Sequence, residues 1–203
     1  IRQLAFSIYL RDVKNQSRIK ETGVVQFSFD AFFENRDKVG FKFFKNTEIL
    51  SNSFELANGI KIDKGSYDDL GFAFNARSNQ SRTFWGDLNF TRGNYFGGGK
   101  TSLIGSVGMR FSNHLTIYAS INQNNIEIND SRFSANIYGL SSEIAINKKW
   151  FIKTLFQYDN FTNISQIYIR LNWIHTPGSD LFVVVNEKYN HTDISQQLLQ
   201  NTI

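Results

Sequence analysis

Apolar and polar residues alternate with a period of two along almost the whole chain. In one segment, Val25, Phe27 and Phe29 fall on one face of an extended backbone, and Gln26 and Ser28 fall on the other. A period of two is typical of β-strands, and no segment shows the 3.6-residue spacing of an amphipathic helix. Similar segments lie near 69–77, 84–90, 102–111, 115–122, 150–159 and 167–173. The pattern predicts an all-β chain.

The predicted strands are long. We expect about eleven strands of roughly 9–13 residues each, whereas strands of soluble proteins average about 5–6 residues and strands that cross a bilayer need about 9–11. Tight turns are predicted near 34–37, 79–81, 112–114, 147–149 and 177–180, and longer connections near 13–22, 49–66, 92–100, 127–133 and 159–163. Short periplasmic turns that alternate with longer outer loops are typical of outer-membrane barrels. The sequence therefore predicts an antiparallel up-and-down transmembrane β-barrel, or part of a larger one.

Aromatic residues gather near the predicted strand ends, on the apolar faces. Membrane barrels carry such residues in two girdles, because an amphipathic ring suits the level of the lipid headgroups. In a soluble sandwich the rings would lie mid-strand in the core. The predicted girdle residues beside tight turns are Phe33, Phe84, Phe111, Trp150 and Trp173, and those at the opposite ends are Phe90 and Tyr158.

Composition narrows the classes of partner. The chain of 203 residues has 20 Phe and no Cys, which excludes a disulfide scaffold and a thiolate metal site. Its net charge of +4 comes from Lys and Arg residues that are spread along the chain, so we expect no nucleic-acid partner. The partner expected from the pattern is outer-membrane lipid, with polysaccharide or other outer-membrane chains as further candidates.

One stretch, NYFGGGKTS at 94–102, resembles a phosphate-binding loop. In such a loop, the glycine that precedes the lysine, here Gly99, has a second glycine five residues before it. In this chain that position is Asn94. The loop must also open a helix, whereas the residues after Thr101 alternate as a strand. We interpret the stretch as an outer hairpin loop, and we expect no cofactor.

The segment from Trp173 to Asn186, WIHTPGSDLFVVVN, has a distinctive pattern with Arg170 before it. Together with FQYD at 156–159 and IKIDKGSY at 60–67, it resembles an uncharacterised family of Gram-negative outer-membrane β-barrel proteins. Members of that family carry an N-terminal domain similar to family-9 carbohydrate-binding modules. The resemblance covers most of the chain in order, and His175 stands where a Tyr is expected.

This resemblance implies that the chain is the C-terminal region of such a barrel. Residues 1–190 are expected to form the barrel section, and 191–203 are expected to be a polar tail or a loop that leads to a missing last strand. Single-chain bacterial barrels have an even number of strands, so about eleven strands would not close alone.

Charged residues of both signs lie on the predicted polar faces. If the apolar faces meet lipid, these charges point into the lumen, where they either set a charge preference or pair with each other across strands. We favour pairing for most of them. The lumen-lining candidates are Asp30, Lys42, Arg77, Asp87, Arg110, Glu143, Lys153 and Arg170.

The sequence does not predict a catalytic or metal site. His114, His175 and His191 lack metal-ligand spacing, and no Ser–His pair with an orienting group is evident. Asp68 and Asp69 are adjacent and would point to opposite faces of a strand. The predicted function is a non-catalytic outer-membrane barrel, either a pore or transport component or a membrane anchor for a carbohydrate-binding-like domain. The alternative is a soluble all-β polysaccharide-binding module.

Overall fold

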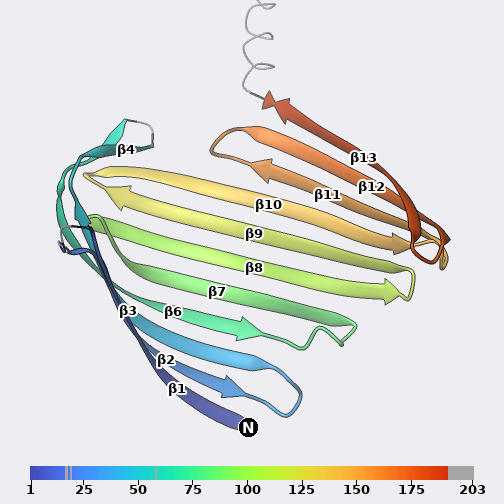
Figure 1. Ribbon diagram of the computed structural model, residues 1–203, viewed down its shortest axis with the longest axis horizontal. Coiled ribbons are helices and arrows are strands. Elements are labelled where there is room, and N and C mark those ends of the chain that lie inside the picture. Colours follow the sequence, from blue (N-terminus) through green and yellow to red (C-terminus); the bar gives the residue numbers. More distant parts are fainter. Residues whose placement is uncertain (17, 19, 58, 192–203) are drawn as a thin grey trace, which may run out of the picture. The chain divides into compact units, whose positions relative to one another are not determined.

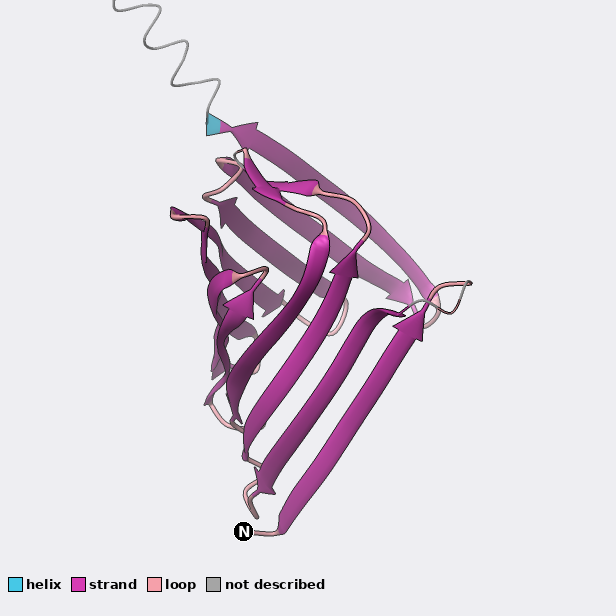
Figure 2. Cartoon of the chain, turned by 90° about the vertical axis from the view of Figure 1, so that its left-hand side faces the viewer, coloured by secondary structure: helices cyan, strands magenta, loops and turns pink. Residues whose placement is uncertain are grey.

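The computed structural model describes residues 1–16, 18, 20–57 and 59–191, and strands dominate it (Figure 2). Eleven strands form one large antiparallel sheet: β1 (Gln3–Lys14), β2 (Lys20–Phe32), β3 (Lys38–Leu50), β6 (Gly65–Arg77), β7 (Phe84–Tyr95), β8 (Gly98–Ser112), β9 (Leu115–Ile128), β10 (Ser131–Ala145), β11 (Trp150–Asp159), β12 (Ile164–Thr176) and β13 (Ser179–Asn190). The predicted all-β class and the strand number are confirmed.

Each strand of the large sheet pairs with its neighbours in the chain, and only the short β4–β5 hairpin interrupts this order (Figure 1). In the part of the chain that the structure describes, the order runs linearly from β1 to β13, and these two strands are not paired with each other. The antiparallel meander is therefore established, and closure into a barrel is not. No described helix is long and apolar enough to cross a membrane.

The chain forms two compact units. Unit 1 comprises Ile1–Asn79, Asp87–Ile104 and Asn124–Ser134. Unit 2 comprises Gln80–Gly86, Gly105–Gln123 and the residues from Ala135 onward. Of the predicted tail at 191–203, only His191 lies among the described residues.

Two connections that were expected to be long are tight turns. β7 and β8 are joined by Phe96 and Gly97, with φ of 48° and 81°, and β9 and β10 by Asn129 and Asp130, with φ of 49° and 61°. Positive φ at both central residues is the geometry of two-residue hairpins, which Gly, Asn and Asp favour. The expected contrast between long and short connections is therefore wrong at these two places. Gly98 to Thr101 belong to β8, and no helix follows them.

The connection predicted at 49–66 contains a hairpin of its own, β4 (Phe54–Ala57) paired with β5 (Ile60–Ile62). Ile60 and Ile62 pack with Phe96, Ile126 and Ile128 into a small core in unit 1. Ile62 and Ile128 are only 2% and 1% exposed. Because Leu50 and Tyr67 also contact this core, the hairpin is fixed on the face of β3 and β6 that these two side chains share.

Candidate functional site

In unit 1 the apolar face of the sheet is exposed to solvent. Phe27 and Phe43, which lie directly opposite each other on β2 and β3, are 53% and 57% exposed. The strand registers place three wholly apolar rows on this face: Leu4–Ala31–Val39–Ala76, Phe6–Phe29–Phe41–Phe74 and Ile8–Phe27–Phe43–Phe72. Phenylalanine rings touch across strands, with centroids 4.9 Å apart for Phe6–Phe29 and 6.1 Å for Phe72–Phe90. We call this surface the apolar face.

The opposite surface, the polar face, is more sheltered. The Asp30 and Lys38 side chains there are 24% and 34% exposed and form an ion pair at 3.0 Å. Soluble proteins shelter apolar side chains and expose charged ones. On β2 and β3 this arrangement is inverted.

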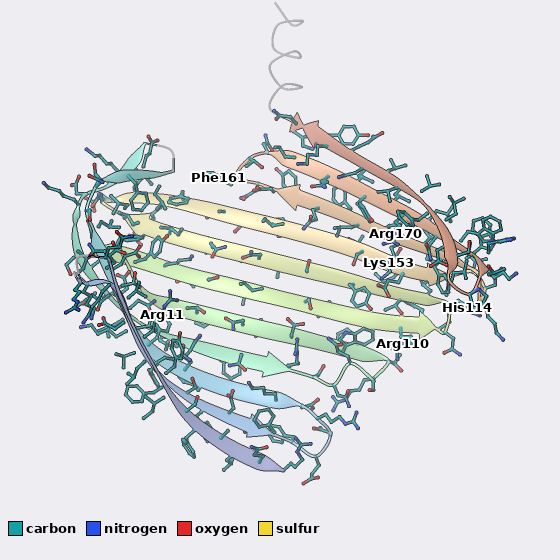
Figure 3. The ribbon with its side chains drawn as sticks, in the orientation of Figure 1. Arg11, Arg110, His114, Lys153, Phe161 and Arg170 are labelled. Atoms are coloured by element: carbon teal, nitrogen blue, oxygen red, sulfur yellow. The ribbon has the colours of Figure 1, made fainter. Side chains whose placement is uncertain are left out.

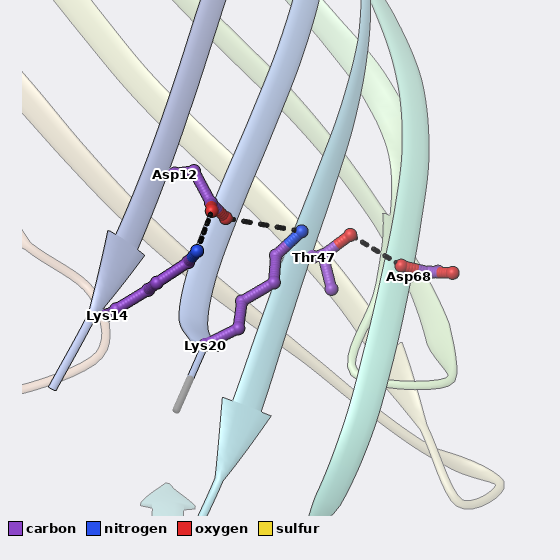
Figure 4. A network of polar contacts seen from close by, with 5 residues as sticks. All are labelled: Asp12, Lys14, Lys20, Thr47 and Asp68. Atoms are coloured by element: carbon purple, nitrogen blue, oxygen red, sulfur yellow. Dashed lines mark hydrogen bonds and ion pairs between the residues drawn. The ribbon is translucent and has the colours of Figure 1, made fainter. Parts of the chain in front are cut away.

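At the strand ends where β1 joins β2, charged residues form the border of the apolar face. Beyond the apolar rows, the Lys14 and Lys20 ammonium groups lie 3.6 and 3.4 Å from the Asp12 carboxylate (Figure 4). On β3 and β6, Asp68 accepts a hydrogen bond from the Thr47 hydroxyl at 2.6 Å and pairs with Lys45 at 2.9 Å. The Lys45 side chain thus extends past its apolar neighbours, and its ammonium group reaches Asp68 in the charged border, as long basic side chains do at membrane interfaces.

In unit 2 the apolar positions of β10, β11 and β12 are bounded by aromatic side chains. Trp150 and Trp173 lie directly opposite each other and stack at 5.6 Å. Tyr138 and Tyr158 form the corresponding pair at the other end. From Trp150 to Tyr158 the strand spans about 27 Å, taking ~3.4 Å per residue. An apolar band about 25 Å tall between two aromatic girdles is characteristic of outer-membrane barrels.

The other predicted girdle residues are less uniformly placed. Phe84 and Phe111 are exposed near strand ends, and Phe33 lies in the turn after β2. Phe90 lies near the middle of β7, opposite Phe74, rather than at a strand end. The next residue on the same face of β7 is Arg92, so Phe90 is the last apolar residue before the charged border.

The predicted lumen residues of unit 1 all lie on the polar face. Arg77 and Asp87 are directly opposite each other on β6 and β7, and a hollow of about 300 Å³ lies beside them and Lys38. The Lys42 ammonium group lies 5.9 Å from the centre of the Phe44 ring. The ion-pair partner of Asp30 is Lys38, which is not among the predicted lumen residues.

In unit 2 the polar face brings three predicted residues into one cross-strand row. Glu143 lies opposite Lys153, and Lys153 lies opposite Arg170 (Figure 3 labels Lys153 and Arg170). Lys153 donates to Glu143 at 2.7 Å. Arg170 lies instead over the Phe182 ring at 4.8 Å. Of the predicted residues, Glu143 and Lys153 pair with each other, whereas Asp30 pairs with Lys38, which is outside the predicted set.

Arg110, also labelled in Figure 3, lies over the Trp85 ring at 5.3 Å. The indole of Trp85 covers Gly108, where any side chain would collide with it. Among the described residues, Lys42, Arg110 and Arg170 form no ion pair. The charges left without a counterion in this group are therefore positive.

The structure brings together one pair that the spacing did not reveal. Ser165 and His191 lie 2.7 Å apart, between the ends of β12 and β13. A Ser–His pair is half of a nucleophilic site, but Ser165 is only 7% exposed, so a substrate carbonyl cannot reach its hydroxyl in this arrangement. We interpret the contact as a structural cross-strand hydrogen bond. No group of residues suited to a metal ion occurs among those described.

Sequence reasoning missed the charged boundary of the apolar face. Its members, such as Lys45 and Arg92, occur at apolar positions of the alternating pattern. A charge at an apolar position near a strand end was the available signal. Asp68 and Asp69 point to opposite faces as expected: Asp68 joins the boundary, whereas Asp69 is buried and accepts from the Phe96 amide at 3.3 Å.

Comparisons with known proteins add no relative. No protein-family model, no curated protein and no solved structure matches the chain. The resemblance to an outer-membrane family therefore stays a prediction.

Proposed function

We propose that the chain is a section of the wall of a transmembrane β-barrel in the outer membrane of a Gram-negative bacterium. Its apolar face contacts lipid, and its polar face lines an aqueous lumen. The observation that carries this proposal is the inverted exposure of the two faces. Phenylalanine side chains on β1, β2 and β3 stay exposed, whereas Asp30 and Lys38 on the opposite face are partly sheltered and paired. Burial against lipid would stabilise those rows by about 25 cal/mol per Å².

The boundaries of the apolar face support the same proposal. A charged network ends it in unit 1, and Trp and Tyr pairs end it in unit 2. In the ranges that the structure describes, the two outer strands, β1 and β13, each have one edge without a partner strand. Within a bilayer such edges must be satisfied, so the proposal requires that these edges pair with each other or with further strands.

Within this wall, we assign the polar face to a passive, non-catalytic path. Lys42, Arg110 and Arg170 favour anions, because no described carboxylate neutralises them. The β4–β5 hairpin lies on the polar face of unit 1 and narrows the path there. The family resemblance adds the role of membrane anchor for an N-terminal carbohydrate-binding-like domain.

Conductance across a planar lipid bilayer tests this function. Addition of the detergent-purified full-length gene product should give discrete current steps, with a reversal potential that shows anion preference. Stable insertion without current steps would assign the anchor role instead of the pore. Failure to insert would contradict the membrane proposal.

A second candidate, a soluble polysaccharide-binding module, draws on one observation. The exposed rings on β1, β2 and β3 form a surface on which sugar rings could stack. This candidate predicts a protein that is soluble without detergent and is retained by an insoluble polysaccharide. The same purification therefore separates the two functions.

A further inference from the structure

A hollow of about 410 Å³ lies in unit 1 between the ends of β7, β8, β9 and β10. Its polar lining includes Arg92, Lys100, Thr101, Asn125, Arg132 and Ser134. A volume of this size admits a headgroup or a small molecule. It lies outside the lumen residues assigned above.

The hollow carries excess positive charge. Its one carboxylate, Glu127, is already engaged by Arg132 at 2.7 Å. Lys100 lies at 5.1 Å over the ring of Tyr95, which packs against the small core. The Arg92 side chain forms no hydrogen bond or ion pair with any described residue. An unpaired guanidinium group in a hollow that also offers hydroxyl and amide groups suits an anion, above all one with several oxygens such as a phosphate.

The position of Arg92 adds an apolar requirement. Arg92 lies directly opposite Phe72, and its neighbours along the same face of β7 and β6 are Phe90 and Phe74, which also oppose each other. Asn125 and Ser134 share a hydrogen bond at 2.8 Å and are exposed. Ile126, the residue after Asn125 on β9, points to the other face and is buried in the small core. The hollow therefore opens on the side of the exposed residues and adjoins the phenylalanine rows. A ligand that fills both regions has an anionic head and an apolar tail.

We propose that this hollow binds the headgroup of an anionic, phosphate-bearing acyl lipid, whose chains lie along the phenylalanine rows. The inference rests on the proposed function, because it places the apolar face in a bilayer. It adds a specific lipid-binding site beside Arg92 to a wall that otherwise contacts lipids without selectivity.

Native mass spectrometry of the full chain released from detergent tests the site. The probes are phosphatidylglycerol, phosphatidylcholine and inorganic phosphate. The variants are Arg92→Gln and, as a matched control, Arg11→Gln. Arg11 lies on β1 opposite Val24, on the polar face, so both variants lose one positive charge but on different faces.

We expect phosphatidylglycerol to be retained more tightly than phosphatidylcholine. Its affinity should fall about tenfold in Arg92→Gln, the effect of one charge-assisted hydrogen bond, and should not change in Arg11→Gln. Equal retention of both lipids, equal losses in both variants, or inorganic phosphate binding as tightly as phosphatidylglycerol would overturn the lipid site. If the protein still requires detergent in those cases, the lipid site is overturned but the proposed membrane function stands. A protein that is soluble in water and binds neither lipid overturns both proposals.

Discussion

Two apolar regions of unit 1 differ in exposure: the small core under the β4–β5 hairpin is buried, whereas the phenylalanine rows are exposed. In the core, Ile62 and Ile128 are almost fully buried. In the rows, Phe27 and Phe43 remain more than half exposed. The same unit therefore buries large side chains where an element covers them. Exposed apolar patches of this extent are typical of surfaces that contact a partner or lipid.

The largest expected effect comes from a charge placed in those rows. Phe27→Lys should destabilise the membrane-embedded protein by ~3.5–7 kcal/mol, from about 2–4 for a lysine near the bilayer midplane and about 1.5–3 for the lost Phe burial. Urea unfolding in lipid vesicles measures this difference. The matched control is Gln26→Lys, because Gln26 is the next residue and lies on the polar face.

The soluble alternative predicts the opposite result for this pair of variants. There, Phe27 is merely an exposed apolar residue, so Phe27→Lys would leave stability unchanged and improve solubility. Equal effects of Phe27→Lys and Gln26→Lys would remove the distinction between the two faces.

A smaller and local effect is expected in the hairpin core. Ile62→Ala should cost about 2–5 kcal/mol, because it leaves a cavity among Ile60, Phe96 and Ile128. Hydrogen exchange should speed up at the β4–β5 amides and stay slow in the phenylalanine rows. Lys61→Ala is the control, since Lys61 is exposed on the same strand. Faster exchange throughout β1, β2 and β3 would show that the hairpin core and the rows unfold together.

The smallest stability effect is expected on the polar face. Glu143→Gln breaks an ion pair whose two side chains are about half exposed, so it should cost less than about 1 kcal/mol. It leaves Lys153 without its carboxylate, so the reversal potential should move further towards anion preference. The Lys153→Gln variant should move it the other way. Shifts of the same sign in both variants would place this pair outside the conducting path.

The period of two was enough to predict most of the fold, because each strand has one distinct apolar face. It predicted the strand number and placed Glu143, Lys153 and Arg170 on one surface. The alternation could not predict the turn at Phe96 and Gly97, because backbone φ decides it, nor the β4–β5 hairpin, whose strands are too short for a pattern. The ion-pair partner of Asp30 and the cross-strand neighbour of Arg92 depend on strand register, which one sequence does not specify.

The central claim is that the apolar face lies in a bilayer. The most direct measurement is to fractionate cells that express the full-length gene product and to run the outer-membrane fraction on a detergent gel, with and without boiling. We expect the protein in that fraction, as a band that shifts on boiling because a folded barrel resists detergent. A protein in the soluble fraction without a heat-dependent shift would contradict the account.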